Sequence, residues 1–150
     1  MNLNVEKILI IGLGMIGSSI ALASKSKGIK VYGFDKSNNS IKEALEKNII
    51  DSKVESILDI NSKDFVKKVD LIIVAVPPKQ TLDVLNDLKN IWNTDVTITD
   101  TSSVKNHIKL NGASNIVLSH PIAGSDQSGI SAANGDLFKN KKNVLCDPFN

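Results

Sequence analysis

A histidine and a serine could carry out proton chemistry at the ends of predicted strands. His120 follows an apolar run at 115–119, and Ser103 follows a run at 96–99. An imidazole exchanges protons near neutral pH, so His120 is a candidate general base. The Ser103 hydroxyl could hydrogen-bond the same substrate oxygen. Each residue could also have a structural role: His120 could hydrogen-bond a loop, and Ser103 could cap a helix. We interpret the other histidine, His107, as a surface side chain.

A glycine-rich segment, G-L-G-M-I-G at 12–17, follows the first apolar run. Such a pattern is informative only between a strand and a helix, and predicted elements at 7–11 and 15–27 meet that condition. In a dinucleotide-binding fold, Gly12 permits the turn, Gly14 admits a pyrophosphate and Gly17 lets the helix pack closely. The helix dipole favours the negative phosphates. The segment therefore predicts a dinucleotide site.

An acidic residue, Asp35, ends the second predicted strand, at 30–35. A carboxylate here accepts hydrogen bonds from both ribose hydroxyls and repels the extra phosphate of NADP. Lys36 softens this preference only in part, so we predict NAD as the cofactor. A glycine-rich turn beside an ordinary surface Asp is the alternative, and a methyltransferase fold is another.

The elements that must position these residues alternate between strands and helices. This order predicts an α/β fold of the Rossmann type, a doubly wound and mostly parallel sheet in a single domain at 1–150. A surface loop is expected at 121–135. Strands are predicted at 7–11, 30–35, 54–57, 71–76, 96–99, 115–119 and 143–146, and helices at 15–27, 40–47, 63–68, 80–91 and 104–110.

Composition excludes several other classes of protein. The 150 residues carry a net charge of +2, and the basic residues are dispersed, which argues against nucleic-acid binding. Cys146 is the only cysteine, so we expect no disulfide, no metal site and a cytoplasmic location. No leader or membrane span is apparent at the N-terminus. All 18 basic residues are lysine, which leaves no arginine fork for a substrate carboxylate.

The order of the motifs resembles the TyrA family of prephenate, arogenate and cyclohexadienyl dehydrogenases. The similarity spans 7–146 and is most specific in D-x-x-S-V-K at 100–105 and H-P-I-A-G at 120–124, with Ser128-Gly129 beyond. It implies NAD-dependent oxidative decarboxylation of prephenate to 4-hydroxyphenylpyruvate, in tyrosine synthesis. His120 would take the ring hydroxyl proton as hydride leaves the same carbon, and Ser103 would hold that hydroxyl.

The resemblance also implies parts that these residues do not supply. Family members carry a second, helical domain that makes a homodimer and provides arginine for a substrate carboxylate. We expect that domain to be absent here, so that the chain alone binds NAD and turns over prephenate slowly or not at all. Asp126 occupies the place near the substrate entrance where the family often has Glu.

Three alternatives to a prephenate dehydrogenase stay open. Arogenate could be the substrate. A β-hydroxyacid dehydrogenase or pyrroline carboxylate reductase would share the glycine motif but not H-P-x-A-G. A non-catalytic NAD-binding module is the third.

The predicted site residues fall into three groups. The catalytic residues are Ser103 and His120, and these two contact the substrate together with Asp126. The expected cofactor contacts are Gly12, Gly14, Met15, Ile16, Gly17, Asp35, Lys36, Val76, Pro77, Asp100 and Ser102.

Overall fold

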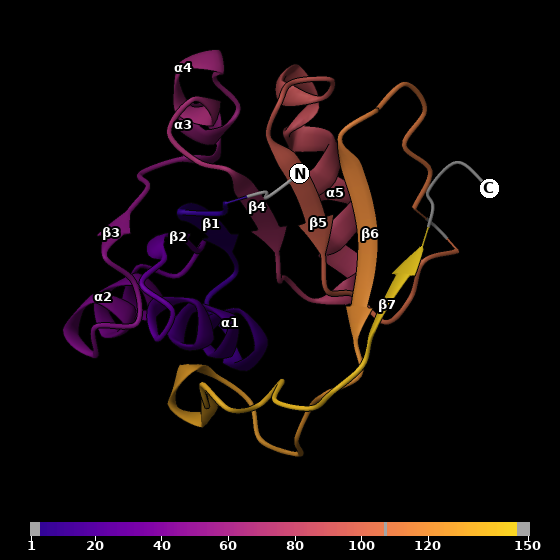
Figure 1. Ribbon diagram of the computed structural model, residues 1–150. Helices are drawn as coiled ribbons and strands as arrows, with labels where there is room; N and C mark the ends of the chain where they lie inside the picture. The colour runs from indigo at the N-terminus through magenta and orange to yellow at the C-terminus, as the bar shows by residue number, and fades with distance from the viewer. Residues whose placement is uncertain (1–3, 107, 147–150) are drawn as a thin grey trace.

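Seven strands form one sheet in the computed structural model, which describes residues 4–106 and 108–146 (Figure 1). The sheet order is β3-β2-β1-β4-β5-β6-β7; β1 to β6 are parallel, and β7 runs antiparallel to β6. This confirms the predicted doubly wound fold. The strands are β1 (Lys7–Ile11), β2 (Lys30–Phe34), β3 (Ser52–Lys53), β4 (Leu71–Val74), β5 (Thr97–Asp100), β6 (Ile116–Pro121) and β7 (Asn143–Cys146).

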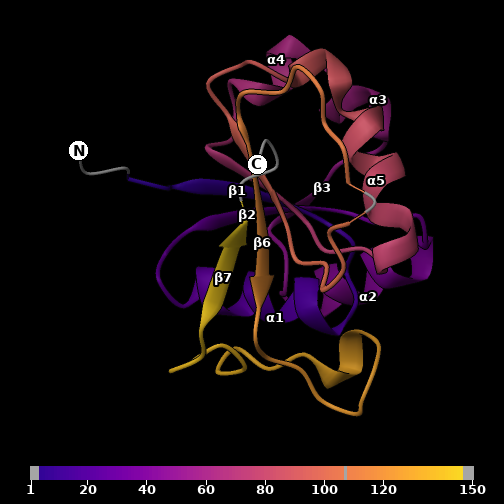
Figure 2. The same cartoon turned by 90° about the vertical axis from the view of Figure 1, so that its right-hand side faces the viewer.

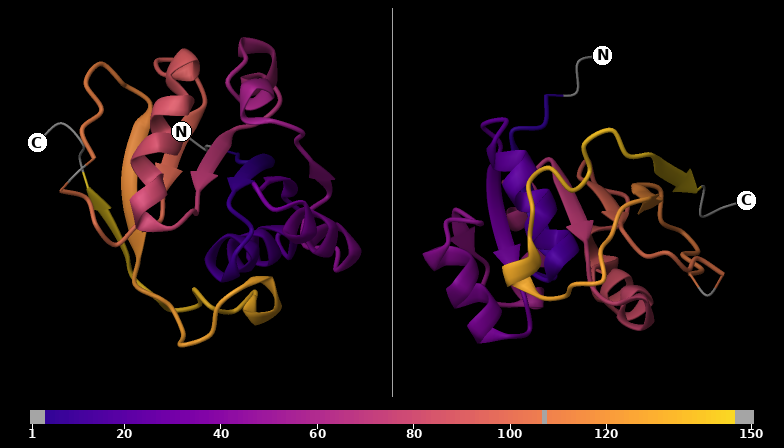
Figure 3. Two further views of the ribbon diagram at one scale, coloured as in Figure 1. Left: turned by 180° about the vertical axis from the view of Figure 1, so that it is seen from behind. Right: turned by 90° about the horizontal axis from the view of Figure 1, so that it is seen from below.

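Helices cover both faces of the sheet (Figures 2 and 3). They are α1 (Met15–Lys25), α2 (Asn38–Glu46), α3 (Ile57–Ile60), α4 (Lys63–Val66) and α5 (Pro78–Asp87), with 3-10 turns η1 (Lys89–Ile91) and η2 (Ile130–Ala132). None of them, within the described ranges, is long and apolar enough to cross a membrane.

Two apolar clusters hold the layers together, one on each face of the sheet. Side chains alternate along a strand. Ile8 and Ile10 of β1 therefore pack with α1 and α2, whereas Leu9 and Ile11 pack with α5 and the short helices. The four side chains are at most 2% exposed. Burying such residues on both faces explains the continuous apolar run of this central strand.

The strand predicted at 54–57 is wrong. The third strand is Ser52–Lys53, and the chain then enters helix α3 at Ile57. The Ser56 hydroxyl accepts a hydrogen bond from the Asp59 amide at 3.2 Å, as a helix cap does. Ile60 is fully buried one turn along, so a capped helical turn satisfies this apolar segment better than a strand.

The helix predicted at 104–110 is also wrong over its described part, 104–106 and 108–110, which is irregular. The Ser102 hydroxyl donates to the Val104 carbonyl at 3.0 Å and lies 3.3 Å from the Val104 amide. Such local bonds compete with helical ones. Ile108 and Leu110 are still buried. His107 lies outside the described residues, so its surface position stays a prediction.

Replacing Gly17 by Ala should destabilise the fold by about 3 kcal/mol, because an added methyl overpacks a backbone contact. An ideal Cβ at Gly17 would lie 1.9 Å from the Gly12 carbonyl oxygen, whereas one at Gly14 would meet nothing within 4 Å. Urea unfolding measures both variants. Gly14→Ala is the control and should change stability by about 1 kcal/mol at most; equal effects of the two would contradict this packing.

A second prediction concerns Asp51, which bonds Lys25 Nζ at 2.8 Å and accepts the Val31 amide at 2.8 Å. Burial raises the pKa of Asp51, but the Lys25 and Val31 hydrogen bonds outweigh it, and the pKa falls below its usual value of 3.8. A carboxyl group whose pKa is lower in the folded state stabilises that state at pH values above its unfolded pKa. This stabilisation is lost as the pH falls through the folded pKa.

Wild type should therefore be more stable than Asp51→Asn near neutral pH. That advantage should shrink as pH falls below about 4. Urea unfolding at several pH values measures it. A difference between the two proteins that is the same at every pH would contradict the carboxylate's role.

Candidate functional site

The carboxyl ends of β1, β2, β4, β5 and β6 open into one cleft of about 760 Å³. The neighbours of β1 are β2 on one side and β4 on the other, so the chain reverses its order across the sheet at this point. In doubly wound sheets, ligands bind beyond the strand ends at such a reversal. The cleft therefore lies where the fold itself favours a ligand.

The glycine turn between β1 and α1 lines the cleft. Gly12 has a φ of +97°, and a Cβ there would lie 2.6 Å from the Ala75 carbonyl oxygen, so only glycine fits. Gly14 begins α1 without any side-chain cap, and the first turn holds no acidic residue. Met15 and Ile16 line the cleft beside it. Uncapped amides at the positive end of a helix dipole suit a pyrophosphate.

Asp35 lies directly after β2 and lines the same cleft. Its carboxylate accepts the Leu13 amide at 2.7 Å and the Ser37 amide at 2.8 Å. These bonds join the glycine turn to the second strand. Each carboxylate oxygen has a further lone pair, so the group could also accept hydroxyl donors from a ligand. Lys36 is exposed at the cleft edge.

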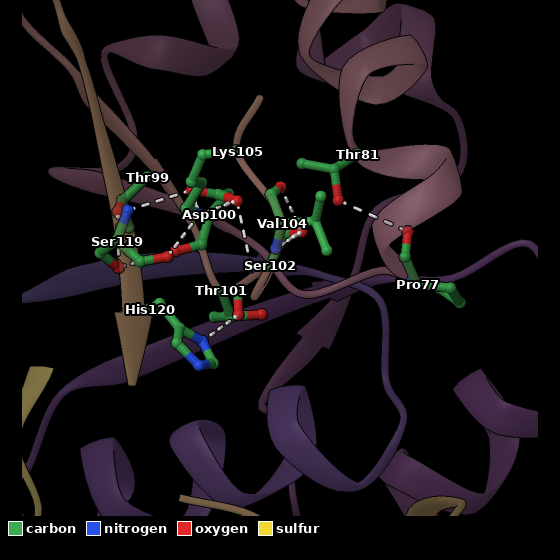
Figure 4. Close-up of polar contacts among 10 residues, drawn as sticks. All are labelled: Pro77, Thr81, Thr99, Asp100, Thr101, Ser102, Val104, Lys105, Ser119 and His120. Atoms are coloured by element: carbon green, nitrogen blue, oxygen red, sulfur yellow. Dashed lines mark hydrogen bonds and ion pairs between the residues drawn. The ribbon is translucent and has the colours of Figure 1, made fainter. Parts of the chain in front are cut away.

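His120 and Ser103 line the cleft on its other side, from β6 and from the loop after β5. Figure 4 shows the half-buried imidazole of His120 beside Thr101, with Nδ1 3.3 Å from the Thr101 carbonyl oxygen. The ring is thus not packed into the interior. Ser103 is exposed, and no helix follows it within 104–106 and 108–110, so its alternative role as a helix cap is wrong.

Three predicted residues do not line the cleft. Asp100 is 0% exposed and pairs with Lys105, so it has no surface to offer a cofactor. Gly17 serves packing, as predicted. Asp126 is exposed outside the cleft lining. The remaining expected contacts do line it, and they include Val76, Pro77 and Ser102.

Residues 127–130 also line the cleft, although no site role was predicted for them. They belong to the segment expected as a plain surface loop at 121–135. Ile130 is instead buried against α1 and α2, and the Ser131 hydroxyl donates to Glu43 at 3.0 Å. Figure 1 shows this segment passing beneath α1 and α2. The only sequence signal was the Ser128-Gly129 pair in the family-like motif.

The described residues contain no group of three or more His, Cys, Asp or Glu side chains that could hold a metal ion. The groups that the cleft does offer are glycine-turn amides, the Asp35 carboxylate, an imidazole and hydroxyls. Such groups can bind a phosphorylated, hydroxyl-bearing ligand and can accept a proton.

Two curated enzymes resemble the chain over nearly all its residues. The chain is 35% identical to a prephenate dehydrogenase of Bacillus subtilis, across 97% of this chain and 40% of that enzyme. It is 38% identical to one of Lactococcus lactis, across 95% and 41%. The chain thus spans about 40% of the length of these relatives.

A solved structure shares the fold. It is a prephenate dehydrogenase from A. aeolicus in complex with hydroxyphenyl propionate and NAD+, which superimposes with a TM-score of 0.84. The two chains are 30% identical, and the similarity covers 98% of this chain and 52% of the A. aeolicus chain. The family described as prephenate dehydrogenase, nucleotide-binding domain, matches residues 20–149. The chain belongs to this family.

Proposed function

We propose that residues 1–150 form the NAD-binding domain of an NAD-dependent prephenate dehydrogenase, which converts prephenate to 4-hydroxyphenylpyruvate with loss of carbon dioxide. One observation carries the proposal: His120 and Ser103 line the same cleft as the glycine turn. A proton acceptor and a dinucleotide site in one cleft are what hydride removal from a carbon bearing a hydroxyl requires.

The residues divide the work along the cleft. Gly14 and the start of α1 hold the pyrophosphate, and Asp35 accepts the ribose hydroxyls. NAD, when bound, supplies the hydride acceptor. At the other end, Ser103 bonds the substrate hydroxyl, and His120 takes its proton as the carbonyl forms. Decarboxylation then makes the ring aromatic, which drives the reaction forward.

Family membership favours prephenate among the alternatives. The matched family and both curated relatives are named for prephenate dehydrogenase, whereas a hydroxyacid dehydrogenase was expected to lack H-P-x-A-G. Arogenate stays the second candidate substrate. The nucleotide-binding domain takes NAD rather than NADP in this proposal because of the Asp35 carboxylate.

Four further expectations belong to the proposal. They are a homodimer, a cytoplasmic location, a helical domain outside these 150 residues, and a place for Asp126 near the substrate entrance. Asp126 is exposed and precedes the segment at 127–130 that lines the cleft. Light scattering of the full-length gene product tests the dimer.

Asp35→Asn should weaken NAD binding about tenfold or more, because hydrogen bonds to a charged group contribute about 1.5–3 kcal/mol. It should also narrow the preference for NAD over NADP, since the repulsion of the extra phosphate is lost. Isothermal titration of the 150-residue chain with each nucleotide measures both. Lys36→Gln, which leaves the carboxylate in place, is the matched control. An unchanged NAD affinity in Asp35→Asn would place the ribose elsewhere.

His120→Asn should lower kcat by about a hundredfold or more in the full-length gene product, because a general base contributes about 10²–10⁴. NAD affinity should change little. The assay follows the reduction of NAD in the presence of prephenate by the absorbance of the reduced nicotinamide. His107→Asn is the matched control and should keep its activity. An unchanged rate in His120→Asn would favour the non-catalytic module.

A further inference from the structure

A buried ion pair joins the end of β5 to Ser119, the residue before the candidate base. Asp100 is 0% exposed, and the side chain of its partner Lys105 is 17% exposed. The Lys105 ammonium lies 2.6 Å and 2.5 Å from the two carboxylate oxygens and donates to the Ser119 carbonyl at 2.7 Å. The charges of the pair balance each other, as a buried carboxylate requires.

The same carboxylate replaces backbone pairing where β5 and β6 part. Parallel pairing between these strands covers only Ile98 with Ile116 and Thr99 with Val117. Beyond that point, Asp100 accepts the Ser119 amide at 3.1 Å and the Ser102 amide at 3.0 Å. The Asp100 side chain thus ties the end of β6 to the loop after β5 (Figure 4).

The two residues whose amides bond Asp100, Ser119 and Ser102, are each adjacent in sequence to a residue of one contact at the cleft, that between His120 and Thr101. His120 follows Ser119, and Thr101 precedes Ser102. The Thr101 carbonyl can only accept a hydrogen bond, so a hydrogen bond across its 3.3 Å contact with Nδ1 favours the neutral ring with the proton on Nδ1. Nε2 then keeps its lone pair and is the ring atom able to accept a proton from a ligand.

We propose that the Asp100–Lys105 pair is a positioning device: by holding the Thr101 carbonyl against Nδ1, it selects the tautomer of His120 in which Nε2 is free to act as the base. Neither residue lines the cleft. This inference rests on the proposed function in calling His120 a base, but the tautomer itself is measurable without any turnover.

The test is nitrogen-15 NMR of the histidine rings in the 150-residue chain, well above neutral pH, where the rings are uncharged. The His120 signals are assigned by comparison with His107→Gln. In wild type, we expect the proton mainly on Nδ1, whereas free histidine carries it mainly on Nε2. In Asp100→Asn and in Lys105→Met, we expect the Nδ1-protonated form to fall below half of the population.

A matched control separates positioning from simple loss of stability. Asp51 also forms an ion pair with a lysine and accepts a backbone amide, but at the other edge of the sheet. Asp51→Asn should lower the urea midpoint and leave the His120 nitrogen signals unchanged. If Asp100→Asn does not fold, Lys105→Gln, which keeps amide N–H donors for the carboxylate but loses the charge, takes its place and should shift the tautomer in part.

Two results would overturn the proposal. One is a wild-type ring with its proton on Nε2, and the other is a folded Asp100 or Lys105 variant whose His120 signals match wild type. Titration of the same samples with NAD tests the proposed function separately, because the chain could fail to bind NAD and still show the selected tautomer.

Discussion

The contact between helix α1 and the end of strand β1 is the constraint on which the cleft depends. Gly17 lies so close to the Gly12 carbonyl that no side chain fits between them. The start of α1 is thereby held at the carboxyl end of β1, with its uncapped amides beside the cleft. Gly12 in turn lies close to the Ala75 carbonyl after β4. The same turn therefore helps to position the neighbouring Val76, which lines the cleft.

Two aspartates organise the loops around this turn, and their surroundings give them different tasks. Both accept backbone amides, which a carboxylate can do in several directions. Asp35 lines the cleft and therefore remains available to a ligand. Asp100 is fully buried with Lys105 and has no open side. Asp35 can contact a ligand in the cleft, whereas Asp100 can only shape a loop that lines it.

The segment after β6 also lines the cleft, although it is far in sequence from the glycine turn. Ile130 anchors it in the apolar cluster shared with α1 and α2, and the Asn134 amide donates to the Ser19 hydroxyl at 2.9 Å. Residues 127–130 are thus held at the cleft by contacts made elsewhere in the segment. Through this segment, residues that follow His120 in the chain reach the side of the cleft formed by the glycine turn.

Local patterns were enough to predict most of the fold, and all but three of the predicted site residues line the cleft. The apolar runs identify β1, β2 and β4, and the glycine motif, Asp35 and His120 were all recognised from their type and their place after a strand. These signals are local, because a strand, a turn and a cap each depend on a few adjacent residues. Short segments were predicted less well, because at 54–57 and 104–110 a serine hydroxyl redirects the backbone.

Only the tertiary structure decided which polar residues face the cleft. Asp100 and Ser103 stand three positions apart in one motif, yet the first is buried and the second is exposed. The difference arises because Lys105 folds back onto Asp100, and residues 127–130 reach the cleft because Ile130 packs on α1 and α2. Contacts between distant segments carry no local pattern, so residue type and spacing determined the chemistry available, and packing determined where it is used.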